Sequence, residues 1–594
     1  MKVGFLITAR LKSTRLPFKL LQEVEGRPIF AHMLDRLKLA KRVDQIVVCT
    51  SDNPQDDPLQ ELAKTEGVSC FRGDEDDVVL RLSAAGKAFN LDYILNITAD
   101  CPFCDPEYAD RIVETYLETN ADLIRAFDLP HGAYSYGVKP AALRQVVEIK
   151  DQRNSEVWGR YFTDTDLFKV YDLPIENEFH RQPGLRMTLD YPADLEFFKA
   201  VFARLYKPGR VFSLDEILRF LRDHPEVVEL NRECGAAFQK RWTSQSAIKL
   251  KPRYEVKRAV VVGCGSIGRR HINNLRQLGV SDVFALRTRQ GFTQELDPAL
   301  EVEEITDSSE LAKLNADVAI ISNPTALHLD AINRCLPFVR GVFIEKPLAA
   351  SLEGVAELIQ QIRTRRVVSF VGYNLQFHPA VKAVQQFLES DQAGRALLFQ
   401  CQVGQWIEDW HPEEDYRNAY FARGDLGGGV LLTLIHEIHM AMQLLGPANR
   451  VACVLPKYDA LSVDVDVVAD LMIDHSHNSV SQIHLDMLQR PAHRRGVVSC
   501  ERGWISYNLL AKSVTAQTAD QPAPFEVWND PNYDINDAYL EQMEAFLNCV
   551  REGRMRHEHD VVAATKSLAI AASARASGES NSFVAIPEWV RELN

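Results

Sequence analysis

A cluster of cations follows the first apolar run of the chain. Residues 3–8, VGFLIT, are typical of a short buried strand, and Arg10, Ser13, Arg15 and Lys19 come soon after it. Ligands of open α/β sheets bind at the carboxyl ends of the strands. Three cations at such an end, with backbone N–H groups beside them, can neutralise and hold a triphosphate. A solvated basic loop is the alternative explanation of the same pattern.

Two carboxylates can complete such a site. Asp100 stands just past the strand-like run 93–98, and Asp190 follows the run 186–189. Mg²⁺ is usually bound by one or two carboxylates, with water and phosphate oxygens completing its shell. We therefore predict Mg²⁺ ligation by Asp100 and Asp190, with helix capping as the alternative role of either carboxylate.

A glycine-rich turn in the second half of the chain predicts a dinucleotide site. The sequence GCGSIG, residues 263–268, follows the strand-like run 258–262 and precedes a helical pattern over 270–278. In this context the motif is a dinucleotide fingerprint, because its glycines permit a tight turn and a close approach of the pyrophosphate to a helix N-terminus. The predicted cofactor contacts are Gly263, Gly265, Ser266, Ile267 and Gly268.

The end of the next predicted strand bears on the choice of cofactor. NAD sites usually carry an acidic residue there for the ribose hydroxyls. This chain instead has Arg287 and Arg289. Guanidinium groups can pair with a 2′-phosphate, which favours NADP(H). NAD(H) stays open, because both arginines can simply be exposed.

Composition and charge limit the class of protein. The 594 residues are 46% hydrophobic and 25% charged, as in an ordinary soluble protein of several domains. The net charge of −15 argues against nucleic acid or an anionic membrane as the main partner. No apolar run reaches the ~18 residues of a spanning helix, and the first run is too short for a signal peptide. We predict a cytoplasmic protein whose eleven cysteines are reduced thiols.

The order of predicted elements indicates an α/β protein. Strand-like runs alternate with amphipathic helical stretches up to about residue 374, and strands with a longer alternation follow. The later strands predict a largely antiparallel sheet with one solvated or interface face. A polar stretch without steady period, residues 244–256, is the predicted linker. The predicted domains are therefore residues 1–243, 257–374 and 375–594. The clearest predicted elements are strands at 3–8, 45–50, 93–98, 258–262, 397–403, 467–473 and 479–485, and helices at 28–42, 59–66, 539–551 and 561–577.

Four motifs of the first half resemble the sugar-acid cytidylyltransferases. They are TARLKSTRLPFKLL, RGDEDDV, NITADCP and MTLDYPAD, and the resemblance covers roughly residues 1–225. This family includes enzymes that activate Kdo and acylneuraminates and relatives of the spore-coat polysaccharide F type. The resemblance implies a Rossmann-like nucleotidyltransferase domain with CTP as donor and Arg10 and Lys19 as catalytic cations. It further implies nucleotide contacts from Arg10, Ser13, Arg15, Lys19, Arg72, Gly73 and Asp76.

Two departures from that family leave the acceptor open. Asn96 stands where close relatives often carry arginine, and residues 154–162 match the acceptor-side segment only loosely. The acceptor can therefore be a nonulosonic or ulosonic sugar acid, a sugar phosphate or another small acid.

The second half resembles the glucose–fructose oxidoreductase/inositol dehydrogenase (Gfo/Idh/MocA) family. The glycine turn is joined by NPTALH, EKP, GYN, FHP and GGG, over about 257–594. The resemblance implies a dinucleotide-binding Rossmann domain followed by an α+β domain that forms a homo-oligomer through its sheet. It implies Lys346 beside the nicotinamide and His436 as the acid/base. The other implied cofactor contacts are Asn323, Pro324, His328 and Glu345.

The altered residues around His436 keep two interpretations open. Thr433 stands where relatives often carry an acid, and His439 where many have aspartate. The first interpretation is a bifunctional enzyme for surface-polysaccharide sugars, a CTP-dependent cytidylyltransferase fused to an NAD(P)-dependent oxidoreductase for a sugar-like hydroxyl or carbonyl. The second is an active nucleotidyltransferase whose dinucleotide-binding half is a non-catalytic scaffold or sensor. A binding protein made of two degenerate folds is a more distant alternative.

Overall fold

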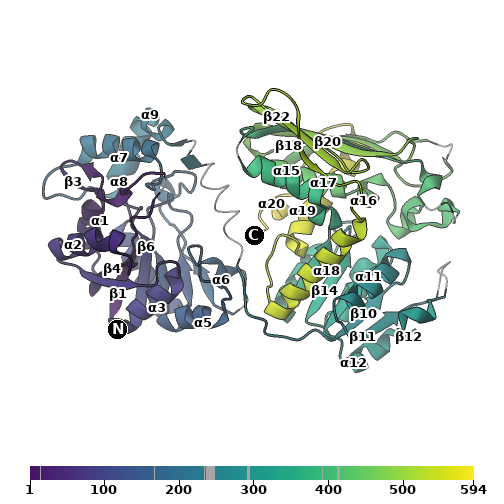
Figure 1. Cartoon of the computed structure of the whole chain (residues 1–594), viewed down its shortest axis with the longest axis horizontal. Helices are drawn as coiled ribbons and strands as arrows, with labels where there is room; N and C mark the ends of the chain where they lie inside the picture. The colour runs from purple at the N-terminus through teal and green to yellow at the C-terminus, as the bar shows by residue number, and fades with distance from the viewer. Residues whose placement is uncertain are drawn as a thin grey trace. The chain divides into compact units, whose positions relative to one another are not determined.

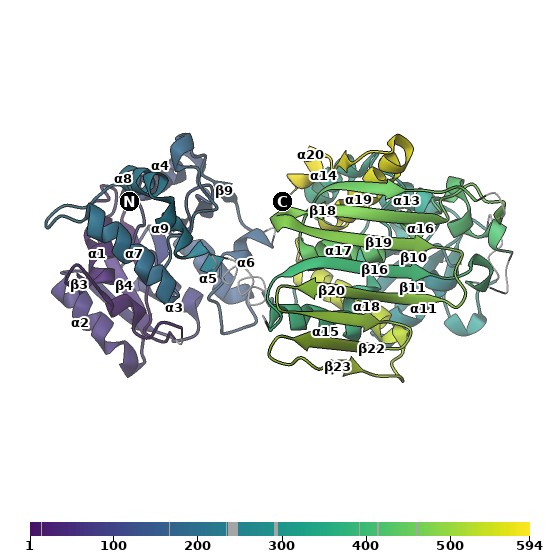
Figure 2. The same cartoon turned by 90° about the horizontal axis from the view of Figure 1, so that it is seen from above.

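The chain divides into two compact units, Met1–Lys251 and Pro252–Asn594 (Figures 1 and 2). The computed structural model describes all residues except 14, 166, 233, 236–247, 290–294, 391, 411, 413–414, 459–460 and 594. The division falls inside the predicted linker 244–256, of which residues 244–247 lie outside the described part. Ile248 and Leu250 are buried in the core of the first unit, so this end of the segment belongs to that unit.

A mixed sheet forms the centre of the first unit. β1 (Val3–Thr8) pairs in parallel with β4 (Gln45–Ser51) and with β6 (Tyr93–Thr98). The full strand order is β5-β4-β1-β6-β8-β7-β9, where the remaining strands are β5 (Ser69–Gly73), β7 (Leu123–Arg125), β8 (Tyr136–Val138) and β9 (Val170–Asp172). Because β1, β4, β5 and β6 are parallel, their carboxyl ends share one edge of the sheet, as the loop chemistry requires.

Alternation along β1 supplies two cores. Phe5 and Ile7 pack with the helices of one face, and Leu6 packs with those of the other. Side chains of a strand point alternately to opposite faces, so this apolar run is buried on both sides. The first core uses α1 (Ile29–Leu37), α4 (Pro106–Thr119), α7 (Pro192–Leu205) and α8 (Leu214–Asp223), and the second uses α3 (Val78–Ala88) and α5 (Pro140–Ile149).

A parallel sheet begins the second unit, in the order β12-β11-β10-β13-β14-β15. Its strand order reverses direction around β10, which creates the crevice where doubly wound folds bind dinucleotides. Helices α11 (Ser266–Gln277), α13 (His328–Cys335) and α14 (Val355–Arg365) connect the strands. The strands are β10 (Arg258–Val262), β11 (Asp282–Leu286), β12 (Glu303–Ile305), β13 (Val318–Ile321), β14 (Gly341–Glu345) and β15 (Val368–Gly372).

A wide, mostly antiparallel sheet completes the second unit (Figure 2). Its order is β23-β22-β21-β20-β16-β19-β18-β17-β24, and β16 and β19 are a parallel pair. Helices α15 (Pro379–Glu389), α17 (His436–Leu445) and α19 (Val561–Ser580) lie on the same side of the sheet (Figure 1). The strands are β16 (Ala396–Gly404), β17 (Ala448–Val454), β18 (Val468–His475), β19 (Ser479–Asp486), β20 (His493–Cys500), β21 (Gly503–Asn508), β22 (Ser513–Thr518), β23 (Phe525–Asn529) and β24 (Val584–Ala585).

The predicted fold class is confirmed, from the Rossmann-like first domain to the antiparallel-rich sheet. Among the described residues, no single helix is long and apolar enough to cross a bilayer. Gly424–Thr433 and His436–Leu445 have the necessary length and apolar composition only as a pair, which is bent by 42°.

Buried histidines make the second unit sensitive to acid. His439 stacks on Tyr373 with 3.8 Å between ring centroids, and its Nδ1 lies 2.7 Å from Ser567 Oγ. Burial lowers the pKa of His439 to about 3, and burial with the nearby Arg494 lowers the pKa of His378 to about 4. Because these folded-state pKa values lie below the unfolded value of about 6.5, acid favours the unfolded state. The stabilising contribution of these neutral histidines is therefore fully present above about pH 6.5, and it is lost progressively as the pH falls below that value.

We therefore predict that a His439→Phe variant has a flatter pH dependence of stability than the wild type. Through His439, the wild type should lose about 1.4 kcal/mol of unfolding free energy for each pH unit below pH 6.5, and the variant should not show this loss. Calorimetric melting of both proteins between pH 7.5 and 5 checks this, with His224→Phe, a partly exposed histidine of the first unit, as control. A constant difference in melting temperature between wild type and His439→Phe at every pH would contradict the prediction.

Candidate active sites

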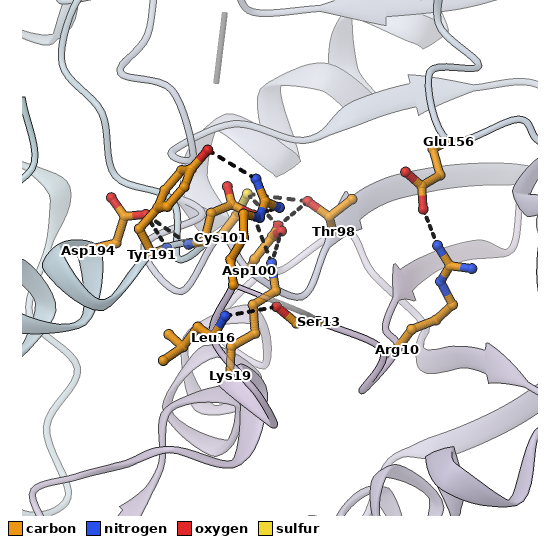
Figure 3. A network of polar contacts seen from close by, with 12 residues as sticks. Arg10, Ser13, Leu16, Lys19, Thr98, Asp100, Cys101, Glu156, Tyr191 and Asp194 are labelled. Atoms are coloured by element: carbon orange, nitrogen blue, oxygen red, sulfur yellow. Dashed lines mark hydrogen bonds and ion pairs between the residues drawn. The ribbon is translucent and has the colours of Figure 1, made fainter. Parts of the chain in front are cut away.

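A buried charge cluster lies at the carboxyl edge of the first sheet (Figure 3). Lys19 Nζ donates to Asp100 Oδ2 at 2.7 Å and to Asp190 Oδ1 at 3.0 Å. Lys19 follows β1, Asp100 follows β6, and Asp190 precedes α7, so the three meet only in the folded chain. The Asp190 side chain is 7% exposed and that of Lys19 is 12% exposed, which strengthens each charge interaction.

Two arginines complete this Lys19 cluster, which comprises Lys19, Asp100, Asp190, Arg15 and Arg186. Arg15 Nη2 donates to Asp190 Oδ1 at 3.1 Å, and Arg186 Nη2 donates to Asp190 Oδ2 at 2.8 Å. Burial opposes ionisation of Asp190, but Lys19 and Arg186 outweigh it and lower its pKa to about 2. Burial also opposes the Lys19 charge, yet the two carboxylates raise the pKa of this lysine. Asp190 and Lys19 are therefore both charged at neutral pH.

Asp194 fixes the turn that carries Asp190. Its Oδ2 accepts the backbone N–H groups of Asp190 at 2.8 Å and of Tyr191 at 2.9 Å, and it also pairs with Arg186. The Tyr191 ring in turn lies under the Arg15 guanidinium, 4.9 Å from its centroid. These contacts orient Asp190 and Arg15 before any ligand arrives.

Arg10 lies apart from the Lys19 cluster, across the loop (Figure 3). Its guanidinium pairs with Glu156 and donates to the Glu75 carbonyl at 2.7 Å, with Asp76 Oδ1 at 3.8 Å. Of the residues predicted from the sequence, Arg10 and Asp76 thus lie together at one end of the loop that follows β1. Arg15 and Lys19 lie at its other end, with the predicted metal ligands Asp100 and Asp190. Ser13 Oγ accepts the Leu16 N–H at 3.3 Å and so stabilises the loop between the two ends.

Arg72 and Gly73 end β5 beside this loop. Arg72 donates to the carbonyls of Ser51 at 2.9 Å and Asn53 at 2.8 Å, and it pairs with Asp57. It therefore braces the segment after β4. A Cβ at Gly73 would come within 3.1 Å of the Phe71 ring and 3.3 Å of the Arg81 side chain, so the glycine permits close packing there.

The two carboxylates suit a divalent cation that is shared with a ligand. Asp100 and Asp190 converge on one point, which the Lys19 ammonium occupies in this structure. Two carboxylates with phosphate and water oxygens form a normal Mg²⁺ shell. Within the described part of the chain, no group of three or more His, Cys, Asp or Glu side chains could hold a metal ion unaided.

The three glycines of the GCGSIG turn are suited to their positions for different structural reasons. Gly263 has a φ of +88°, and a Cβ there would lie 2.6 Å from the Asn323 backbone nitrogen. A Cβ at Gly268 would lie 2.1 Å from the Gly263 oxygen, so these two glycines allow strand, turn and helix to meet. A Cβ at Gly265 would meet nothing within 4 Å. This glycine, with Ser266 and Ile267 at the start of α11, leaves the helix N-terminus open to an anion.

Both arginines after β11 contact one glutamate. Arg287 Nη1 donates to Glu304 Oε2 at 3.1 Å, and Arg289 Nε donates to Glu304 Oε1 at 2.6 Å. The Arg287 side chain is 5% exposed and that of Arg289 is 57% exposed, so Arg289 is the one open to a ligand. The arginines are therefore partly neutralised where a nucleotide ribose would bind.

His328 links two loops at the carboxyl edge of the second sheet. Its Nδ1 lies 2.9 Å from the Pro347 carbonyl, and its Nε2 lies 2.9 Å from the Asn323 carbonyl. Pro324 begins the turn that leads to this buried histidine, and Glu345 Oε1 lies 2.7 Å from His271 Nε2. These residues position the loops on both sides of Lys346.

Lys346 and His436, the predicted catalytic residues of the second unit, interact electrostatically. Lys346 Nζ donates to the Thr433 carbonyl at 2.8 Å, and burial lowers the pKa of this lysine. Burial, followed by the nearby cations Lys346 and Arg494, lowers the pKa of His436 well below its usual range. His436 is therefore neutral, and its Nδ1 has no hydrogen-bond partner among the described residues. A neutral imidazole beside a cation can accept the proton of a substrate hydroxyl.

The structure shows what the two altered residues near His436, Thr433 and His439, contact. Thr433 supplies the acceptor for Lys346 through its backbone carbonyl, a role that any residue type can fill. His439 packs in the core against Tyr373 and Ser567. Sequence reasoning missed Arg186, Asp194, Glu437 and Arg494, although the first two flank or belong to the MTLDYPAD motif.

Three family models match the chain. Residues 5–203 match a cytidylyltransferase model, 257–373 match the oxidoreductase family with an NAD-binding Rossmann fold, and 381–506 match a GFO/IDH/MocA C-terminal domain.

Curated relatives of both halves were also found. The spore coat polysaccharide biosynthesis protein SpsF of Bacillus subtilis is 28% identical over 38% of this chain and 95% of its own length. The 3-deoxy-manno-octulosonate cytidylyltransferase of Neisseria meningitidis is 27% identical over 39% of this chain and 90% of its own length. The scyllo-inositol 2-dehydrogenase (NAD(+)) of B. subtilis is 23% identical over 50% of this chain and 87% of its own length.

The two halves thus match separate enzyme families, each over a site built from that family's motifs. The first unit therefore carries a cytidylyltransferase domain, and the second unit carries the two domains of a Gfo/Idh/MocA oxidoreductase.

Proposed function

We propose that this protein is a bifunctional enzyme of sugar activation. Its first unit transfers CMP from CTP to a sugar acid, and its second unit oxidises or reduces a hydroxyl or carbonyl of a sugar-like compound. The observation that carries the proposal is the Lys19 cluster, in which two carboxylates and three cations meet at the carboxyl edge of a parallel sheet. The names of SpsF and of the Neisseria enzyme support a sugar-acid acceptor and a role in surface polysaccharides.

In the first reaction, an acceptor oxygen attacks the α-phosphorus of CTP and pyrophosphate leaves. One P–O bond forms while another breaks, and charge collects on the phosphate oxygens. Lys19 and Arg15 hold those oxygens, and Arg10 with Asp76 closes the nucleoside end of the loop. Mg²⁺ held by Asp100 and Asp190 would supply further charge neutralisation. Asp194 and Arg186 keep Asp190 in position, so little reorganisation is needed during the reaction.

In the second reaction, a hydride moves between the carbinol carbon and a nicotinamide cofactor. In the direction of oxidation, His436 accepts the hydroxyl proton and Lys346 orients the hydroxyl oxygen. Gly263, Gly265 and Gly268 shape the pyrophosphate site, and Arg289 gives a reason for NADP(H), with NAD(H) the other possible cofactor.

We also propose that the second unit forms a homo-oligomer through the uncovered face of its large sheet. This face carries an open groove of about 970 Å³, lined by side chains that include Gln400, Gln482, His484 and Met472. Met472 is 44% exposed there, although its strand lies inside the sheet order. A cytoplasmic location and the lack of a nucleic-acid partner also stay predictions.

We predict that Asp100→Asn abolishes nucleotidyl transfer while CTP binding persists. The amide keeps the shape of the side chain, but it loses the charge that pairs with Lys19 and the oxygen anion that Mg²⁺ needs. Pyrophosphate release with CTP, Mg²⁺ and a panel of sugar acids should fall at least ~100-fold. Asp223→Asn, whose side chain is 59% exposed, is the control. A near wild-type rate in Asp100→Asn would refute the assigned role.

We predict that His436→Gln binds the nicotinamide cofactor normally and loses hydride transfer by ~100-fold or more. The amide cannot accept the hydroxyl proton. Cofactor fluorescence measures binding of NADPH and NADH, and absorbance at the nicotinamide band measures turnover. His224→Gln, at a partly exposed histidine of the first unit, is the control. A wild-type protein that binds cofactor but turns over no sugar or nucleotide sugar would favour the scaffold or sensor interpretation instead.

A further inference from the structure

A second charged pair lies next to the predicted acid/base of the oxidoreductase. Arg494 Nε donates to Glu437 Oε1 at 2.7 Å, and Arg494 Nη2 donates to Glu437 Oε2 at 2.9 Å. Glu437 follows His436 directly in α17, and Arg494 comes from β20 of the large sheet. The Glu437 side chain is 1% exposed, whereas that of Arg494 is 22% exposed. The carboxylate is thus sealed in the protein, while the guanidinium keeps one side open.

Folding stability alone gives little reason for the buried Arg494–Glu437 pair. Removing two charges from water often costs as much as their attraction returns, and apolar residues of similar volume are often at least as stable. Glu437 uses Nε and Nη2 of Arg494, and within the described part of the chain no hydrogen bond involves Nη1. Two hydrogen bonds therefore fix the Arg494 guanidinium, and its Nη1 donor has no partner among the described residues.

Two lysines act on the same histidines as Arg494 does: Lys346 on His436 and Lys512 on His378. Lys346 donates to the Thr433 carbonyl, and Lys512 donates to the Pro531 carbonyl at 2.8 Å, so neither ammonium has a carboxylate as its hydrogen-bond partner there. His436 and His378 are neutral and feel the Arg494 charge. Glu437 pairs with Arg494, and Glu345 and Glu437 both attract the Lys346 ammonium without a hydrogen bond to it among the described residues.

The sheet makes room for this arrangement. β20 pairs with β21 so that Gly496 faces Tyr507, and a Cβ at Gly496 would lie 2.7 Å from the Tyr507 ring and hydroxyl. The buried Tyr507 hydroxyl has no hydrogen-bond partner among the described residues. A second unused polar group thus belongs to the same surroundings, since the Tyr507 hydroxyl and Arg494 interact electrostatically.

We propose that Arg494 binds the anionic group of the oxidoreductase substrate, with Glu437 as its positioning residue, and that this substrate is an acidic sugar. The inference rests on the proposed oxidoreductase function and adds the substrate class. It gives both units substrates of one chemical class, because the cytidylyltransferase unit is proposed to act on a sugar acid. The two units can then act on the same compound in two successive reactions.

The test compares matched substrates on the full chain. A hexuronate, the corresponding hexose and the hexose phosphate are assayed with the wild type, Arg494→Lys and the double variant Arg494→Met with Glu437→Met. The double variant avoids leaving a buried carboxylate without a partner. Arg495→Met removes the same charge from the next residue of β20, which points to the opposite face, and it is the control, with its assembly checked by size-exclusion chromatography.

We expect the wild type to prefer an anionic substrate, and we expect the double variant to lose about 10- to 100-fold in kcat/KM for it, chiefly through KM. The neutral hexose should change little, so the preference collapses. Preference for the hexuronate or the phosphate identifies which anion is bound. A wild type that prefers the neutral hexose, or a preference that survives in the double variant, would overturn the inference.

Equilibrium binding separates this inference from the proposed function. Calorimetric titration of the preferred acid into the NADH-saturated chain needs no turnover. Heat that is present in the wild type and in Arg495→Met but lost in the double variant supports the Arg494 site, even if hydride transfer fails. Equal binding in all variants contradicts it, even if hydride transfer succeeds.

Discussion

The ammonium of Lys19 between two carboxylates is the contact on which the first unit depends. Lys19 and its two partners lie on segments that follow β1, follow β6 and precede α7, so they meet only when β1 and β6 are adjacent and parallel. Each charge in this buried set needs the others. Loss of one member of a buried pair typically costs about 3–5 kcal/mol, because it leaves its partner uncompensated. The same convergence that is costly to build places cations and carboxylates where an anionic transition state can use them.

In the second unit, burial keeps several titratable groups neutral, whereas the Lys19 cluster of the first unit holds buried charges. Burial keeps His378, His436 and His439 neutral, and His436 is influenced by the charges of Lys346 and Arg494, so the proton acceptor and the positive charge are separate groups. The glycine turn handles the cofactor with backbone alone: Gly263 and Gly268 serve internal packing, and Gly265 leaves space for a ligand. The glycine turn follows β10 of the parallel sheet, whereas Arg494 lies in β20 of the large sheet, so the proposed cofactor and substrate contacts come from different sheets.

Much of this was accessible from the sequence. The strands at 3–8, 93–98 and 258–262 have the predicted bounds, because short apolar runs between polar turns are buried on both faces. The gathering of Lys19, Asp100 and Asp190 followed from strand order and motif. Contacts between distant segments were not accessible. The separation of Arg10 from Lys19 depends on Glu156, the partner of Lys346 is a backbone carbonyl at Thr433, and the Arg494–Glu437 pair joins a strand to a helix with no motif in common.

The most direct test of the central claim is pyrophosphate release by the wild-type chain with Mg²⁺, each of the four nucleoside triphosphates and a panel of sugar acids and sugar phosphates. The account predicts release with CTP, only in the presence of Mg²⁺ and of an acidic sugar. Release with another triphosphate alone would contradict the CMP assignment. No release with any combination, in a protein that binds no nucleotide by calorimetry, would contradict the Lys19 cluster as a nucleotidyl-transfer site.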